Sequence, residues 1–474
     1  MKQAGGQLAG TQRSVVLGFA IGGAAMMAAN QVIAVLVLRF LTDNLAISAG
    51  IAATLFALVK IYDGFVDPLA GYASDRARTR WGRRVPFLFA AGLLMPLSIV
   101  GIFAAPAWDS QPLLLLWIGV MLALHGTAFS LYTVPSTAMI VEVSDDYHAR
   151  SSILAWKTYG SFAGQILGSS VPSWLLESWG AGRAGHAAMG WVLAGLIGAL
   201  ALGSIPLLLR ARATNAEANH PGRFTDQLRI AWANQPFRIM VFVHIVFMVG
   251  VATASVSNAY FTRYVLARSD AWLGLFYVFL TAGNILALPA WLRISRRFDK
   301  KNAYIAALAV YGLAVLSWAL AGPHESLIVL GLRTTVIGAA MSGVVLLAAS
   351  MLTDAVRYDF ICSGQRREGA FSGFMSFVDK ISNAGGLMIM GATLSAMGYA
   401  ASSTGAAQAQ STSAVFAIRI CFAIIPALAP LLSIFLLRGY TLTEPDLVET
   451  VAEAPLAAQD VGLDSEGTAT AAAG

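Results

Sequence analysis

Three charged residues lie close together in an otherwise apolar stretch of the chain, residues 57–68. Lys60, Asp63 and Asp67 are spaced i, i+3 and i+7, so a helix would place all three on one face. A charged side chain at bilayer depth costs about 2.5–3.5 kcal/mol on insertion scales, and two carboxylates one turn apart also repel each other. Lys60 can neutralise one carboxylate, and a bound Na⁺ or proton would neutralise the pair. The alternative is a buried Lys60–Asp63 ion pair, with Asp67 facing a water-filled vestibule.

Hydroxyl groups on a second apolar stretch, residues 130–137, offer further ligands to a cation. Hard cations prefer oxygen ligands. Pro135 frees a backbone carbonyl, and that oxygen together with the hydroxyl of Ser130 or Thr133 would complete the shell of a cation. Ordinary hydrogen bonding within a kinked helix is the alternative interpretation.

A third apolar stretch contains Lys157 directly after Trp156. A cation beside an aromatic ring suits a sugar ring or an anionic group, whereas a lysine that snorkels to the membrane interface is the competing interpretation. We place Tyr132 with these two as a candidate for binding a solute. Asn30 is strongly polar near the middle of the first apolar stretch, and it either faces a cavity or bonds to a neighbouring helix.

The composition indicates that lipid surrounds the elements that carry these residues. Of 474 residues, 57% are hydrophobic and 12% are charged, about half the charged share of a soluble globular protein. The net charge of +6 comes from short basic loops between apolar stretches, as the positive-inside rule expects. We therefore expect a lipid bilayer, and no nucleic acid, as the partner of this surface.

Enzyme chemistry is not predicted. The six histidines are scattered without ligand spacing, and Cys362 and Cys421 have the spacing of neither a metal site nor a disulfide framework. No catalytic triad, metal cluster or phosphate loop is evident, so we expect no cofactor apart from a coupling ion and no energy source other than an ion gradient.

About twelve stretches are long and apolar enough to cross a bilayer. They lie near residues 14–41, 49–72, 85–106, 112–139, 152–177, 187–211, 236–260, 270–292, 303–321, 325–352, 369–398 and 412–438. We expect an all-α integral membrane protein with a six-helix half over residues 1–212, a central cytoplasmic loop over 213–235, a second half over 236–440, and a disordered cytoplasmic tail over 441–474.

Loop charge predicts the orientation of the chain. With the N-terminus in the cytoplasm, the outer segments hold few basic residues, namely Arg39, Arg183, Arg263 and Arg268, while basic clusters fall in the inner loops. We expect a multi-pass protein of the cell inner membrane with both termini cytoplasmic, acting as a monomer.

Five motifs spread over both halves carry a family resemblance. They lie at residues 63–68 (Asp-Gly-Phe-Val-Asp-Pro), 75–84, 132–136, 157–164 and 354–380. Together they resemble the signature of the glycoside–pentoside–hexuronide:cation symporters, the melibiose-permease-like family of the major facilitator superfamily. That resemblance implies a major facilitator fold and the coupling of Na⁺, Li⁺ or H⁺ to sugar uptake by alternating access.

The resemblance also implies roles for individual residues. The paired carboxylates that bind the cation fall on Asp63 and Asp67, and the assisting hydroxyl falls on Ser130. The basic residue on the fifth span falls on Lys157, and the lysine of the eleventh span falls on Lys380, which we count as a solute-binding candidate.

The same resemblance implies a cytoplasmic gate in the basic loop after the second span. Its members are Asp75, Arg76, Arg80, Arg83 and Arg84. This loop can pair with acidic helix ends and hold the inward gate shut, through Glu142, Asp145 or Asp146.

The solute half of the site departs from the sugar transporter of this family. Where that transporter has carboxylates on the first and fourth spans, this chain has Met27 and Thr133. The prediction is therefore a cation-coupled symporter of a sugar- or glycoside-type solute, and the alternative is a carrier of the same fold for a lysolipid-like, peptide or other amphiphilic solute. The same carboxylates serve Na⁺ and H⁺, so the sequence leaves both ions open.

Overall fold

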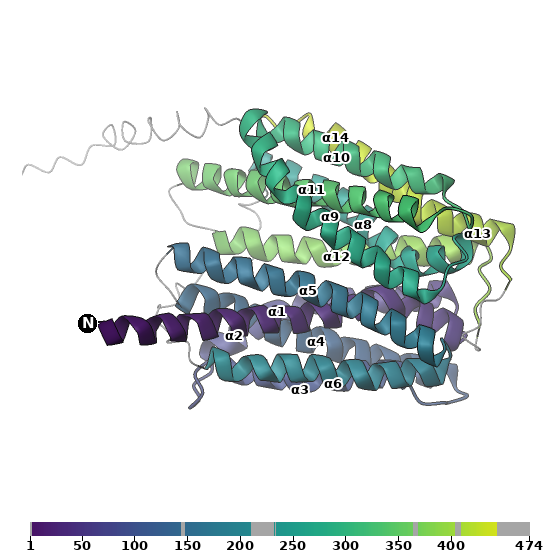
Figure 1. Cartoon of the computed structure of the whole chain (residues 1–474), viewed down its shortest axis with the longest axis horizontal. Helices are drawn as coiled ribbons and strands as arrows, with labels where there is room; N and C mark the ends of the chain where they lie inside the picture. Colours follow the sequence, from purple (N-terminus) through teal and green to yellow (C-terminus); the bar gives the residue numbers. More distant parts are fainter. Residues whose placement is uncertain are drawn as a thin grey trace, which may run out of the picture.

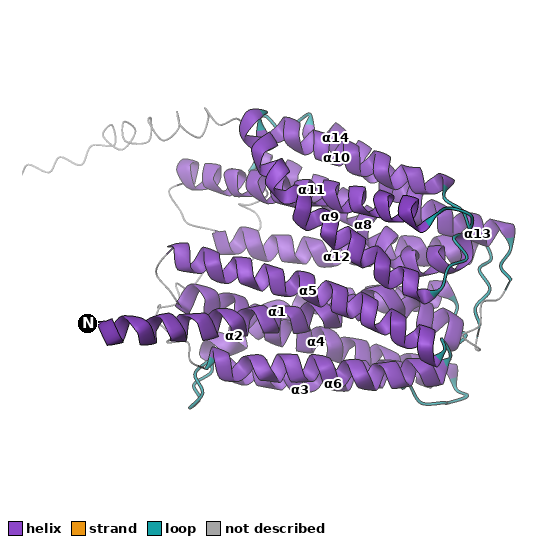
Figure 2. Ribbon diagram, in the orientation of Figure 1, coloured by secondary structure: helices purple, strands orange, loops and turns teal. Residues whose placement is uncertain are grey.

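The computed structural model describes residues 2–143, 147–209, 232, 234–363, 368–402 and 409–442. Within these residues all regular structure is helical (Figure 2). This confirms the prediction of an all-α chain. The predicted central loop falls mostly, and the predicted tail almost entirely, outside the described residues.

Six long helices form the first half of the molecule, at one side of the view in Figure 1. They are α1 (Lys2–Asn44), α2 (Ala49–Arg76), α3 (Val85–Phe103), α4 (Gln111–Val143), α5 (Tyr147–Trp179) and α6 (Arg183–Leu208).

Six further helical segments form the second half. They are α8 (Gln235–Tyr260) with η1 (Phe261–Val265), α9 (Asp270–Arg297), α10 (Lys300–Leu316) with η2 (Ser317–Leu320), α11 (Leu327–Ser363), α12 (Glu368–Ala396), and α13 (Thr412–Arg419) with η3 (Ile420–Ile424) and α14 (Ile425–Leu437). The two halves meet along α2 and α12, α5 and α9, and α1 and α8.

Ten of these segments are long and apolar enough to cross a membrane. The remaining two, α5 and α12, are 33 and 29 residues long, long enough to cross a membrane, but they lack an equally apolar stretch among their described residues. Several helices run past the predicted apolar stretches; α11, for example, continues to Ser363 rather than ending near 352. An apolar pattern marks only the part of a helix that lies in hydrocarbon, so it underestimates helix length.

Glycines set the closest helix contact in the first half, between α1 and α5. Gly160, Gly164 and Gly168 lie against the backbone carbonyls of Ala20, Ala24 and Ala28, and a Cβ at any of these glycines would overlap with the carbonyl oxygen. Lipid supplies no hydrophobic drive between helices, so small residues that allow close backbone approach provide the packing. This contact fixes the middle of α5 against α1.

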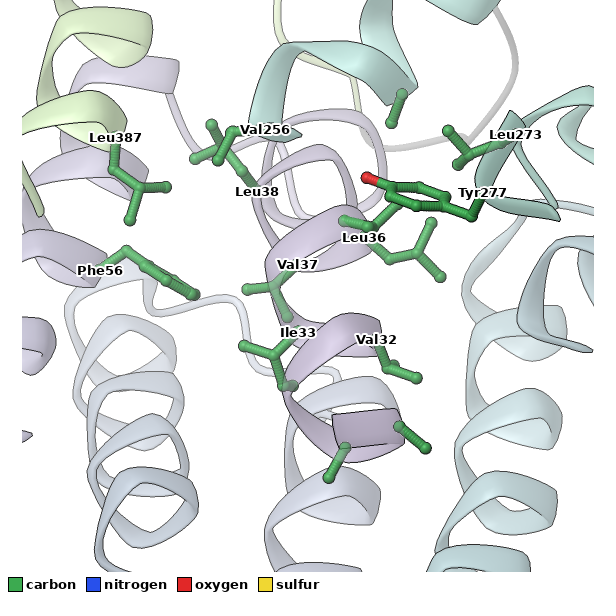
Figure 3. Packing of buried hydrophobic residues seen from close by; sticks show 14 of the residues in the cluster. Val32, Ile33, Leu36, Val37, Leu38, Phe56, Val256, Leu273, Tyr277 and Leu387 are labelled. Atoms are coloured by element: carbon green, nitrogen blue, oxygen red, sulfur yellow. The ribbon is translucent and has the colours of Figure 1, made fainter. Parts of the chain in front are cut away.

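Apolar side chains from both halves meet around the second part of α1 (Figure 3). Leu36 of α1 lies beside Tyr277 of α9, while Leu387 of α12 lies beside Phe56 of α2. Val256 of α8 completes the group, and all five side chains are buried. The halves are therefore sealed together at the end of the bundle opposite the N-terminus.

Candidate cation and solute site

The two carboxylates of α2 each contact a lysine ammonium. Asp63 Oδ2 lies 3.2 Å from Lys60 Nζ on the same helix, and Asp67 Oδ2 lies 2.6 Å from Lys380 Nζ on α12. Lys380 also donates to the backbone oxygen of Asp63. The ion pair between Asp67 and Lys380 thus joins the two halves of the protein.

Hydroxyl groups complete the surroundings of Asp67. Ser130 Oγ on α4 donates to Asp67 Oδ1 at 2.5 Å, and Ser376 Oγ on α12 donates to Oδ2 at 3.3 Å. The hydroxyl of Thr133, predicted beside Ser130, instead donates to the backbone oxygen of Phe129 at 2.8 Å. One of the two predicted hydroxyls therefore lies at the carboxylates, and the other lies away from them.

One oxygen of the Asp63–Asp67 pair has no hydrogen-bond partner in the described part of the chain. Asp63 Oδ1 is buried and accepts no hydrogen bond from the described residues. Gly126 of α4 faces this oxygen, and a Cβ at that position would overlap with it. A buried acceptor left unpaired costs about 1–3 kcal/mol, and a hard cation is the ligand that such an oxygen suits. Within the carboxylate pair, Asp63 Oδ1 is therefore the candidate ligand for a small cation.

A small cavity lies next to this site, within the first half. Its volume is about 90 Å³, and residues of α1, α4 and α5 line it: Phe19, Gly22, Gly23, Met26, Met27, Phe129, Tyr132, Thr133, Ser136, Lys157 and Ser161. Helix α4 contributes to both the carboxylate site and the cavity, because Ser130 contacts Asp67 while Phe129 and Thr133 line the cavity. Cation site and cavity are thereby linked through one helix.

Two of the five predicted solute-binding residues line this cavity, and the other three do not. Tyr132 and Lys157 line the cavity, where Lys157 Nζ donates to Thr137 Oγ1 at 2.9 Å, and the Tyr132 hydroxyl lies 2.5 Å from Ser204 Oγ. Asn30 and Trp156 are not part of this lining, and Trp156 is 54% exposed. Lys380, as described, lies at the carboxylates.

Most predicted gate residues interact within their own loop and helix end. Arg84 pairs with Asp75 at 2.9 Å and donates to Ser74 Oγ at 3.2 Å. Arg76 stacks 3.9 Å from the ring centre of Tyr72.

The other predicted gate residues are two arginines of the same loop and three acids at and after the end of α4. Arg80 lies 5.3 Å from the ring centre of Trp81. Arg83 interacts with another residue. The side chain of Glu142, and both Asp145 and Asp146, lie outside the described residues. The predicted pairing of the basic loop with these acids stays a prediction.

Three ion pairs were not predicted from the sequence. At the sealed end, Arg39 pairs with Asp270 and Arg263 pairs with Asp43. Next to Lys380 on α12, Asp379 lies 2.5 Å from His244 Nε2 of α8. Asp43 and Asp270 lie close in the sequence to the few arginines predicted on the outer side, and this proximity could have indicated the pairs. Those arginines were used only to predict the orientation of the chain.

Known proteins resemble this chain over most of its length. A family model described as MFS/sugar transport protein matches residues 18–444. The chain is 27% identical over 394 residues to the isoprimeverose transporter of Lactiplantibacillus pentosus, which covers 82% of this chain and 80% of that protein. It is 26% identical over 450 residues to the inner membrane symporter YicJ of Escherichia coli (strain K12), with 92% and 93% covered.

A solved structure of a D-xylose-proton symporter has the same fold. It superposes with a TM-score of 0.65 and 17% sequence identity, over 90% of this chain and 99% of that one. At this identity the likeness concerns the fold alone, and it confirms the predicted major facilitator architecture of two six-helix halves.

Proposed function

We propose, since the chain belongs to the MFS/sugar transport protein family, that it carries a sugar- or glycoside-type solute across the membrane together with Na⁺ or H⁺. The family membership agrees with the motif resemblance, and it makes the chain a multi-pass membrane transporter and not an enzyme. The observation that carries the coupling proposal is the carboxylate pair of Asp63 and Asp67, with one buried oxygen that lacks a partner.

The mechanism follows from the charges around that pair. Lys380 of the second half reaches Asp67 of the first half, so it acts as a tethered counter-ion. A cation that binds Asp63 Oδ1 and Asp67 competes with this ammonium and weakens the link between α2 and α12. Cation binding then changes the equilibrium between the two orientations of the halves, and that shift couples the ion to the solute.

Orientation is part of the proposal. Basic loops at the end that carries the N-terminus support a cytoplasmic location of both termini by the positive-inside rule, in a protein of the inner membrane of the cell. With this orientation the sealed end would face outward, and the conformation would be an inward-facing one. We propose a monomer in the lipid bilayer that needs no cofactor beyond the coupling cation.

Uptake into proteoliposomes tests this function. A panel of labelled isoprimeverose, D-xylose, methyl glycosides and a lysolipid would be offered under a Na⁺ gradient, a pH gradient, or neither. We expect accumulation of a sugar-type member that depends on one gradient, and its loss in Asp63→Asn and Asp67→Asn variants that still fold. Accumulation that persists in either variant would remove that carboxylate from the coupling site, and uptake of the lysolipid alone would replace the sugar-type solute.

A further inference from the structure

One face of α12 carries polar side chains where this helix crosses the membrane. Ser376, Asp379, Lys380 and Asn383 are spaced i, i+3, i+4 and i+7, so they lie along one side of the helix. The side chain of Asp379 is 50% exposed. Because intramembrane charged residues face the interior of a bundle or a water-filled space and not lipid, protons and ions in water can reach this side of α12.

Two residues of this face connect α12 to its neighbours through charge. Lys380 Nζ lies 2.6 Å from Asp67 Oδ2 of α2, and Asp379 Oδ1 lies 2.5 Å from His244 Nε2 of α8. The first contact joins the two halves, whereas the second lies within the second half. The contact between His244 and Asp379 therefore forms a site separate from the carboxylate pair of α2, although consecutive residues of one helix connect the two.

His244 is able to change its charge near neutral pH. Imidazole is the side chain whose ordinary titration falls between pH 5 and 8. A neutral imidazole can donate its Nε2 hydrogen to the Asp379 carboxylate, and a protonated one keeps that hydrogen bond and adds an ion pair. The side chain of His244 is 19% exposed, so water has access to it. The pair can therefore gain or lose one proton and keep its contact.

The charges near His244 favour such a proton. Helices α2 and α12 bring two lysines and three carboxylates to the middle of the membrane, namely Lys60, Lys380, Asp63, Asp67 and Asp379. With a neutral imidazole this group has one uncompensated negative charge, and a proton on His244 brings its sum to zero. Since uncompensated charge is costly away from water, the group binds one further cation more readily than two.

The other elements packed against α8 and α12 place no further charge at this level, among the residues that the structure describes. Helix α14 has no charged side chain, and the charges of α1, α9, α11 and α13 lie toward the ends of their membrane spans. Asp354 of α11, for example, pairs with Lys300 of α10 at 2.5 Å. These helices carry no second histidine in their described parts, so titration near neutral pH falls to His244.

We infer that His244 and Asp379 form a second cation site, which binds a proton in the second half of the transporter. A proton at this site and a cation at the Asp63–Asp67 pair weaken each other's binding, because each neutralises the same excess negative charge. Linkage makes this effect equal in both directions. The inference adds a second ion to the proposed function, and it rests on that function for the cation at α2.

Nuclear magnetic resonance of ¹⁵N-labelled histidine tests the proton site directly, on the full chain in nanodiscs. The imidazole signal that disappears in His244→Gln belongs to His244. We expect this signal to titrate between pH 5 and 8, and its midpoint to fall by about half a pH unit in Asp379→Asn, which removes the opposite charge. His324→Gln, at an exposed loop position, should leave it unchanged. A signal that does not titrate in this range, or a midpoint that Asp379→Asn does not move, overturns the inference.

Sodium titrations test the opposition between the two ions. The Na⁺ concentration that gives half-maximal thermal stabilisation would be measured at pH 5.5 and 7.5. Because protons also compete for Asp63 and Asp67 themselves, the wild type is compared with His244→Gln, whose imidazole charge is absent at both values. We expect acid to raise this concentration about threefold more in the wild type. An equal rise in the two proteins overturns the inference.

Failure of the inference can be told apart from failure of the proposed function. If Na⁺ stabilises neither protein, Asp63→Asn decides, because it removes the excess negative charge and should lower the midpoint of the His244 signal; an unchanged midpoint overturns the inference. Cation-driven uptake by the wild type would in that case leave the proposed function standing. Uptake that depends on no ion gradient removes the proposed function, whereas a His244 signal that titrates still supports the proton site. Should a variant not fold, the wild-type titration decides.

Discussion

Arg39 at the end of α1 and Asp270 at the start of α9 form a two-point ion pair across the boundary between the halves, with N–O distances of 2.6 and 2.9 Å. Beside it, Asp43 accepts from Arg263 at 3.2 Å and from the Tyr399 hydroxyl at 2.7 Å. Burial raises the pKa of Tyr399, so its phenol stays protonated and donates. Any conformation that opens this end must separate both pairs.

Replacing Arg39 with methionine should favour opening of the sealed end. The change leaves the carboxylate of Asp270 without its cation in an apolar setting, and breaking a buried pair in this way costs about 3–5 kcal/mol. We expect a cysteine at position 256, placed in a background without Cys362 and Cys421, to react with a water-soluble maleimide at least tenfold faster in the variant.

Two comparisons make this result specific. Arg183→Gln removes an arginine that bonds only to carbonyls of its own half, those of Ala105 and Pro106 among the described contacts, and should leave labelling unchanged. The charge-swapped variant Arg39→Asp/Asp270→Arg should return labelling toward the wild-type rate. Unchanged labelling in Arg39→Met would mean that the apolar contacts alone hold this end shut.

A methyl group at Gly126 should block the cation site. Gly126→Ala would place its Cβ against Asp63 Oδ1, and overpacking of a filled site costs about 1–3 kcal/mol. We expect the rise in melting temperature that the coupling cation produces in the wild type to be lost. Gly195→Ala is the control, because a Cβ there meets nothing within 4 Å, and it should keep the response. A full cation response in Gly126→Ala would place the ion elsewhere.

The sequence predicted those parts of the site that depend on short spacing. Helical periodicity alone predicted that Lys60 lies within reach of Asp63. The apolar stretches alone predicted the twelve membrane-spanning segments. The partner of Asp67 could not be predicted in this way, because Lys380 is 313 positions away and reaches it only through the packing of α2 against α12.

Other features depend on packing in the same sense. Gly126 is one of 45 glycines, and its role appears only when α4 is placed against α2. Arg39 and Asp270 are 231 residues apart in the sequence. The distribution of loop charge predicts that both lie on the same side of the membrane, but it does not predict that they form a pair.

Removing the ammonium of Lys380 should strengthen binding of the coupling cation. In the wild type this ammonium occupies Asp67 at 2.6 Å, so an incoming ion must displace it. We expect Lys380→Met to lower the concentration of Na⁺ or H⁺ that gives half-maximal thermal stabilisation by about tenfold, equivalent to roughly 1.4 kcal/mol. Lys380→Arg keeps the charge and should stay close to wild type. Weaker cation binding in Lys380→Met would show that the lysine supports the site instead of competing for it.

The close contact of α1 and α5 should be sensitive to a single methyl group. At Gly164 a Cβ would overlap with the backbone oxygen of Ala24, so Gly164→Ala must push the helices apart and should lower the free energy of unfolding by about 1–3 kcal/mol. Gly203→Ala in α6 meets nothing within 4 Å, and there the same change should stabilise by about 0.5–1 kcal/mol, because alanine restricts the unfolded chain.

The same pair of variants separates packing from solute binding. Gly164 lies two turns after Lys157 on the same face of α5, so its displacement should also weaken solute binding, whereas Gly203→Ala should leave binding unchanged. Thermal melts in nanodiscs, followed by binding measurements below the melting temperature, would resolve both effects. Equal melting temperatures for the two variants would mean that α1 and α5 can move apart without loss of stability. The contact between these helices would then not be what holds Lys157 in position.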